Sequence, residues 1–79
     1  MTNNDVIKNC REVAKAAGLT FKVNPRTKIR GRTSYMFTCR KTGETVLENC
    51  TLLNAYSNCL TGYIESWNGE KFDGINVYQ

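Results

Sequence analysis

The 79-residue chain is long enough for one domain, residues 1–79, with a small hydrophobic core, and it has no room for a separate cofactor domain. Hydrophobic residues make up 41% and charged residues 23%, a composition that excludes an intrinsically disordered chain. The net charge of +4 favours an anionic partner, and no apolar run is long enough to cross a membrane.

The N-terminal sequence and the cysteines predict a cytoplasmic protein. Residues 1–15, MTNNDVIKNCREVAK, lack the apolar segment of a secretory signal. The four cysteines are too far apart for the usual closely paired zinc ligands, and the chain has no histidine. We therefore expect buried free thiols, no metal and no cofactor at Cys10, Cys39, Cys50 and Cys59.

An amphipathic helix is predicted over residues 4–17. Its apolar residues recur at i, i+4, i+7, i+8 and i+11, which is one helical face. Asn3, Asn4 or Asp5 is expected to cap the start, and Gly18 to end the helix. The apolar face consists of Val6, Cys10, Val13, Ala14 and Ala17.

Three strands are predicted next. The first, LTFKV (residues 19–23), is expected to end at Asn24-Pro25, because proline cannot donate a hydrogen bond to a sheet. RTKIRGR (residues 26–32) is then expected to form an exposed loop. TSYMFTCR (residues 33–40) alternates in the manner of a half-buried strand, and the turn KTGE joins it to TVLEN (residues 45–49) as a hairpin.

A second helix is predicted from Thr51, its N-cap, to about Trp67, with Gly69 near its C-cap. In the alternative, Gly62 ends this helix and a hairpin turns at Asn68-Gly69. A short last strand is expected at residues 75–78. The α-β-β-β-α order predicts a two-layer α+β domain, in which both helices pack on one face of a three-stranded antiparallel sheet.

Positive charge is concentrated in one part of the sequence. Residues 13–43 contain eight of the 11 Lys and Arg residues and no acid, whereas residues 44–79 contain one lysine and five acids. Like charges repel, so folding alone does not favour this clustering. The densest stretch, FKVNPRTKIRGRTSYMFTCRK, covers residues 21–41.

This pattern is typical of phosphate binding, because a row of Lys and Arg displaces counterions from a nucleic acid. In an extended chain, the four cations of residues 26–32 share one side. Tyr35 is the best-placed ring to stack on an unpaired base, although its register with Phe37 also fits a core position. The expected nucleic-acid contacts are Lys22, Arg26, Lys28, Arg30, Arg32, Tyr35, Arg40 and Lys41. A basic protein–protein interface and a merely solvated surface are the alternatives.

No residue pattern specifies a chemical reaction. The absence of histidine excludes Ser-His and Cys-His pairs, and no glycine-rich phosphate loop is present. Cys39 is next to Arg40 and Lys41, which lower a thiol pKa, but its register with Tyr35 and Phe37 favours burial. We therefore expect a protein without catalytic activity.

The segment RKTGETVLENCTLLNAYSNCLTGYIESWNGEKF resembles small basic accessory proteins of large tailed phages. That resemblance implies a protein that acts on a host function or a defence system in the cytoplasm of a bacterial host. The strand–turn–strand–helix order is similar to the arm-binding domains of phage integrases, which dock a three-stranded sheet on DNA. The full order is similar to double-stranded-RNA-binding domains, whose second helix has a lysine-rich start where this chain has residues 51–54, TLLN.

Two functions follow from these patterns. We expect a non-catalytic nucleic-acid-binding protein, with RNA slightly favoured over DNA. The alternative is an inhibitor that binds a host enzyme or defence complex through the basic hairpin or through a C-terminal aromatic patch. The patch consists of Tyr63, Trp67, Phe72 and Tyr78. No pattern in the chain indicates an oligomeric state.

Overall fold

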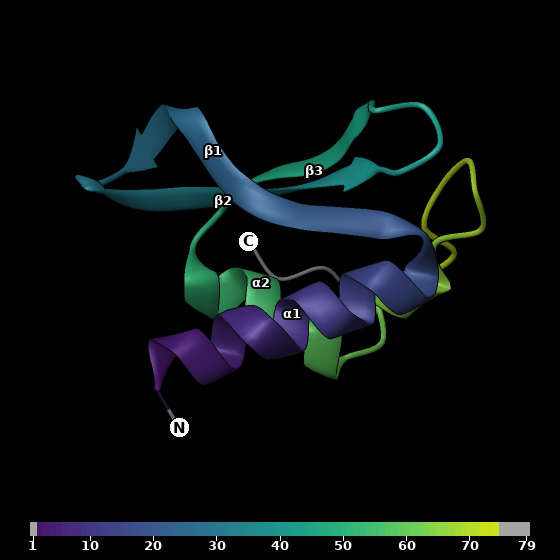
Figure 1. Ribbon diagram of the computed structural model, residues 1–79, viewed down its shortest axis with the longest axis horizontal. Coiled ribbons are helices and arrows are strands. Elements are labelled where there is room, and N and C mark those ends of the chain that lie inside the picture. Colours follow the sequence, from purple (N-terminus) through teal and green to yellow (C-terminus); the bar gives the residue numbers. More distant parts are fainter. Residues whose placement is uncertain (1, 75–79) are drawn as a thin grey trace.

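Three antiparallel strands form a sheet in the order β1-β2-β3, and both helices cover the same face of it (Figure 1). The computed structural model describes residues 2–74. This arrangement confirms the predicted two-layer α+β fold with the order α-β-β-β-α. The elements are α1 (Asn3–Ala17), β1 (Leu19–Ile29), β2 (Arg32–Cys39), β3 (Thr45–Cys50), α2 (Leu52–Leu60) and the 3-10 turn η1 (Ile64–Ser66).

Helix α1 is capped by Thr2, and the expectation of a cap at residues 3–5 was wrong. The Thr2 hydroxyl accepts the N–H of Asp5 at 3.2 Å, and the Asp5 carboxylate accepts the N–H of Thr2 at 3.1 Å. These two bonds form a capping box, which satisfies two otherwise unpaired N–H groups. Gly18 ends the helix, as predicted, with the left-handed φ of 85°.

Strand β1 continues past Pro25 to Ile29, where the sequence predicted a strand end and a loop. Proline is tolerated because β1 is an edge strand and because its register on β2 shifts between Asn24 and Lys28. The Asn24 side-chain oxygen accepts the N–H of Arg26 at 3.1 Å and supports this irregular segment. The sheet therefore has a longer first hairpin than predicted.

Arg30 and Gly31 form the two-residue turn between β1 and β2, since Ile29 pairs directly with Arg32. Their φ angles of 51° and 78° are both positive, as a type I′ hairpin turn requires. Glycine adopts this conformation freely, whereas arginine is an uncommon residue there. The predicted hairpin of β2 and β3 is confirmed.

The core lies between the sheet and the helices. The Phe21 ring contacts Tyr35 at 5.1 Å and Phe37 at 4.9 Å between ring centroids, and Phe37 is fully buried. All four cysteines are buried free thiols, as expected. The other buried core residues are Ala14, Leu19, Ala55 and Ile64.

Helix α2 ends at Leu60, so the predicted continuation to Trp67 was wrong. Gly62 adopts a φ of 82°, which stops a right-handed helix. Trp67 instead pairs with Phe72 across a turn in which the Asn68 side chain accepts two backbone N–H groups. The alternative is confirmed in that Gly62 ends the helix and the chain turns at Asn68-Gly69, but residues 64–66 form the 3-10 turn η1 instead of a hairpin strand. The proposed strand at residues 75–78 lies outside the described residues.

No helix within residues 2–74 has the length and apolarity that a bilayer span requires. The molecule measures 32 × 27 × 21 Å along its principal axes. A molecule of this size has few fully buried side chains. Each buried polar group therefore has a large effect on the free energy of unfolding.

A pair of hydroxyl deletions tests the packing. The Ser34 hydroxyl is fully buried and has no hydrogen-bond partner in the described part of the chain, whereas the Thr51 hydroxyl accepts the N–H of Asn54 at 3.1 Å and caps α2. We predict that Ser34→Ala leaves the free energy of unfolding unchanged or raises it, because no bond is lost. Thr51→Ala lowers it by about 1 kcal/mol. Urea unfolding measures both, and a loss of stability in Ser34→Ala would contradict the packing described.

Candidate nucleic-acid interface

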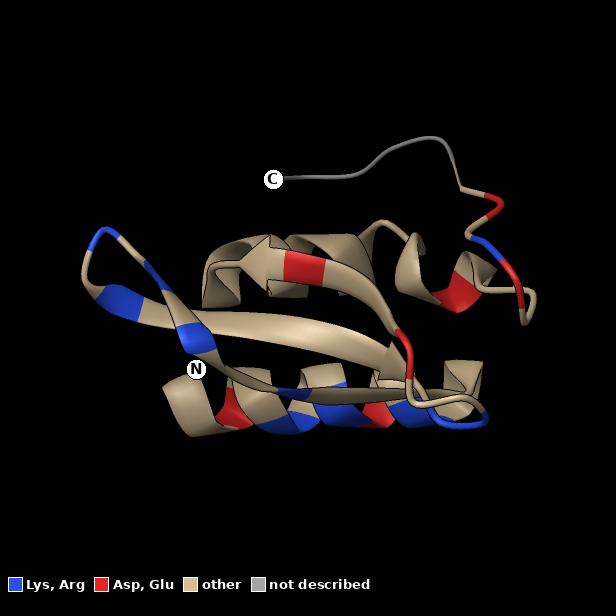
Figure 2. Ribbon diagram, turned by 90° about the horizontal axis from the view of Figure 1, so that it is seen from above, with Lys and Arg blue, Asp and Glu red and all other residues tan. Residues whose placement is uncertain are grey.

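Ten of the 11 Lys and Arg residues form one basic side of the molecule. Figure 2 shows them along α1, along β1, and at the turns that precede and follow β2. The acids of β3, η1 and the loop after η1 lie on the opposite side. The acids near the basic side are Asp5 and Glu12 on α1 and Glu44, whose carbonyl closes the turn that holds Arg40 and Lys41. All ten cations are solvent-exposed: Lys8, Arg11, Lys15, Lys22, Arg26, Lys28, Arg30, Arg32, Arg40 and Lys41.

The cations of residues 26–32 do not form the single extended row that the sequence predicted. Arg26 and Lys28 belong to the end of β1, Arg30 lies in the turn, and Arg32 begins β2. The chain therefore reverses between them and gathers four positive charges around the end of one hairpin. This hairpin end projects from the body of the molecule, at the left of Figure 2.

Arg40 and Lys41 form a second group at the opposite end of β2, in the turn that leads to β3, as predicted. The eight residues of β2 separate the two groups by roughly 25 Å. The turn is held by backbone bonds, including Arg40 N–H to the Gly18 carbonyl at 3.1 Å and Gly43 N–H to the Cys39 carbonyl at 2.7 Å. Lys22 lies on β1 between the two groups.

Helix α1 adds three cations that the sequence reasoning did not assign to the site. Lys8, Arg11 and Lys15 are spaced at i, i+3 and i+7, so they share one exposed face of the helix. The helical spacing of these cations is the sequence signal that could have identified them. The net charge of the N-terminal segment alone does not reveal this spacing. They extend the basic side beneath β1.

The cations of the basic side are not neutralised within the fold. Among residues 2–74, none of them forms an ion pair with an Asp or Glu. Exposed cations without partners keep their full electrostatic attraction for an anion, and they do not have to break existing pairs to bind it. The acidic residues instead repel anions from the opposite side.

Tyr35 has two environments. One face of its ring stacks on Phe21 with an interplanar angle of 9°, so that side of the ring belongs to the core. The residue also lines a groove together with Arg32 and Tyr56. Tyr35 therefore does not present a free two-sided ring, although part of it faces the basic hairpin end.

The aromatic residues at the C-terminal end mainly contact one another. Tyr63 stacks on Phe72 with ring centroids 4.5 Å apart, and Trp67 contacts Phe72 at 5.0 Å. All three are half-buried against the core. Tyr78, the fourth residue of the predicted patch, lies outside the described residues. The patch thus closes one end of the core.

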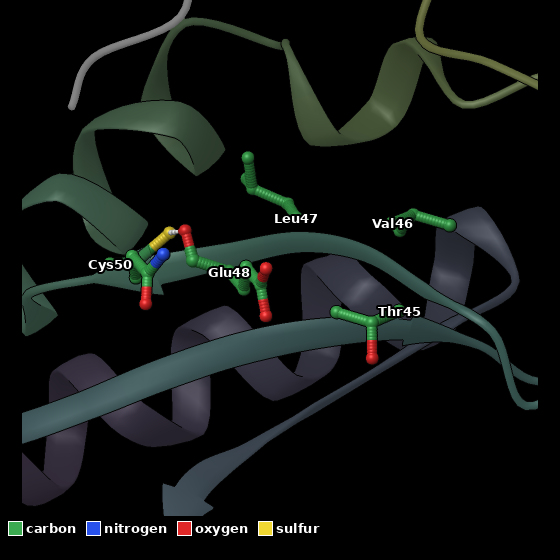
Figure 3. A pocket seen from close by; sticks show the side chains of 6 residues that line it. Thr45, Val46, Leu47, Glu48 and Cys50 are labelled. Carbon is green, nitrogen blue, oxygen red and sulfur yellow. Dashed lines mark hydrogen bonds between the residues drawn. The ribbon is translucent and has the colours of Figure 1, made fainter. Parts of the chain in front are cut away.

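Strand β3 is the second edge strand of the sheet, and a hollow of about 400 Å³ runs along it (Figure 3). Leu47 extends toward the side of α2 and η1, whereas Thr45 and Glu48 point away from it. The Cys50 thiol donates to the Glu48 carbonyl at 3.7 Å. This edge has one carboxylate and no cation, unlike the basic edge formed by β1.

Neither a protein-family model, nor a curated protein, nor a solved structure matches the chain.

The thiols give a test of the turn that positions Arg40 and Lys41. The Thr42 hydroxyl and the N–H groups of Thr42 and Lys41 hydrogen-bond the Cys39 sulfur and lower its pKa, whereas burial raises the pKa of Cys50 to about 11. A lowered pKa means more reactive thiolate at neutral pH. We predict that iodoacetamide modifies Cys39 faster than Cys50 in the native protein, as measured by mass spectrometry of peptides.

Thr42→Val serves as the matched variant, because it removes the hydroxyl and keeps the shape of the side chain. It is expected to slow the alkylation of Cys39 without affecting Cys50. Equal alkylation rates for Cys39 and Cys50 in the wild-type protein would contradict the geometry of this turn.

Proposed function

We propose that the protein is a non-catalytic nucleic-acid-binding protein whose basic side contacts phosphates. The observation that supports this most is the separation of charge, with ten exposed cations on one side and most of the acids on the other. A nucleic acid presents a regular row of phosphates, and cations that neutralise them release counterions. The proposal includes a cytoplasmic location and a partner that is RNA in preference to DNA.

The shape of the basic side favours backbone contacts over the reading of base sequence. Its cations come from the exposed face of α1, an edge strand and two turns. Within residues 2–74 both helices pack on the sheet, and neither stands apart as a helix that enters a groove of a duplex. Phosphate contacts position a protein on a nucleic acid without specifying its sequence. We therefore propose binding with little sequence preference.

Binding is expected to depend steeply on salt. If six phosphates are contacted, affinity falls by roughly 10³-fold between about 50 and 200 mM salt, because each contact releases counterions. Fluorescence anisotropy with labelled RNA and DNA probes measures this slope. A flat dependence on salt, or no binding at the lowest salt, would contradict the proposal.

Arg30→Asn separates binding from folding. Asparagine is favoured at a positive φ in a type I′ turn, so the variant is expected to fold at least as stably as the wild type while it loses one cation. We predict that it binds every probe more weakly and that the salt slope falls by about 1.

The matched control is Lys71→Asn, which makes the same change in charge at an exposed lysine in the acidic part of the molecule. It is expected to leave binding nearly unchanged. Equal losses in the two variants would mean that only net charge matters, and would refute a defined basic side.

Protein binding at β3 is a second candidate function, supported by the open strand edge and its hollow (Figure 3). An extended segment of a partner can add to such an edge through main-chain hydrogen bonds. A pull-down from nuclease-treated bacterial lysate distinguishes the two candidates. If the wild-type protein still retains one protein after nuclease treatment and Leu47→Lys does not, protein binding at β3 is favoured. If nuclease treatment removes all partners, nucleic-acid binding is favoured.

A further inference from the structure

A groove of about 740 Å³ opens beside the basic hairpin end, where three elements meet. The start of α1 contributes Asn3 and Val6, and residues 31–35 contribute Arg32 and Tyr35. The start of α2 contributes residues 51–53 and Tyr56. Its volume is in the range of ligand-binding pockets in proteins.

The walls of this groove are mainly apolar and aromatic. Val6, Leu52, Tyr35 and Tyr56 are half-buried and form its inner surface, whereas Leu53 is 72% exposed at its mouth. The groove therefore offers an apolar surface to a flat or branched group from outside.

Arg32 is the one charged residue among the described residues that line the groove, and Asp5 lies close by in the first turn of α1, next to Val6. Arg30 is two residues away from Arg32, and the lining residues include no acid. The first turn of α2 also contains no acid, so its N–H groups add partial positive charge at the same end of the molecule. A ligand that is both apolar and anionic fits this combination.

We propose that this groove binds an unpaired base of a single-stranded nucleic acid, while the phosphates next to that base contact the hairpin cations. The inference rests on the proposed function and adds that the nucleic acid bound by the protein is single-stranded. In a single strand each base is free to leave its neighbours and to pack on aromatic and apolar side chains. In a duplex the bases stay stacked and paired, so the groove remains empty. RNA and DNA strands share this chemistry.

The test compares three anionic probes at one salt concentration. These are a labelled single strand, as RNA and as DNA, its duplex, and inorganic polyphosphate as a competitor that has phosphates but no bases. We expect the single strand to bind about tenfold tighter than the duplex, the gain typical of stacking one base. Polyphosphate is expected to displace the duplex more readily than the single strand.

Two leucines on α2 provide matched variants. Leu53 lines the groove, whereas Leu60 is similarly exposed, at 67%, lies two turns further along the same helix and does not line it. Leu53→Ala is expected to weaken single-strand binding several-fold and to leave duplex binding unchanged. Leu60→Ala is expected to change neither. Circular dichroism and urea unfolding check that both variants fold.

Each outcome separates this inference from the proposed function. Equal binding of single strand and duplex, with no effect of Leu53→Ala, would overturn the base site and leave phosphate binding intact. No binding of any probe at low salt would overturn both. Self-association in sedimentation that Leu53→Ala abolishes, with no effect on the nucleic acids, would assign the groove to a second copy of the chain and overturn the inference. A difference between the RNA and DNA strands within the expected pattern supports the site and names the preferred strand.

Discussion

The packing of Phe21, Tyr35 and Phe37 is the interaction on which the rest of the structure depends. The Phe21 ring lies 5.1 Å from Tyr35 and 4.9 Å from Phe37, so one strand of the first hairpin is locked onto the other at the centre of the core. Because side chains alternate along a strand, this fixes which residues of β1 and β2 face the helices. With both helices on that face, the long cationic side chains remain at the edge, at the turns and on the outer side of α1.

The packing of the first hairpin onto the core also determines where the charged residues lie. A chain that places eight cations in succession without an acid has to keep them in water, because an unpaired charge in the core is costly. The long first hairpin does this by extending residues 26–32 away from the core and reversing at Arg30-Gly31. Arg30 has a positive φ, which is less favourable for arginine than for asparagine or glycine.

Elements that are determined by short stretches of sequence were predicted correctly. The alternation of residues 33–40 and the Gly43 turn gave the hairpin of β2 and β3, and the apolar spacing with Gly18 gave α1. The length of β1 was missed because Pro25 normally ends a strand, and only its edge position in the folded sheet removes that cost. The end of α2 was missed because the apolar spacing continues past Gly62, although its left-handed backbone stops the helix. In the candidate site, the loop and strand cations were predicted, whereas the cations of α1 were not. The charges of residues 1–12 cancel, which hides Lys8 and Arg11, and Lys15 lies outside the densest basic stretch, residues 21–41.

The central claim is that one side of the molecule contacts a nucleic acid. Nuclear magnetic resonance of the nitrogen-labelled protein, titrated with a short single-stranded RNA at low salt, tests it most directly, because each backbone amide reports its own surroundings. Shifts are expected to concentrate at residues 26–33, at Lys22 and residues 40–41, at the exposed face of α1 and around the groove at the start of α2. Amides of β3 and of residues 64–73 are expected to stay in place. Shifts confined to β3 and residues 64–73, or no shifts at all, would contradict the account.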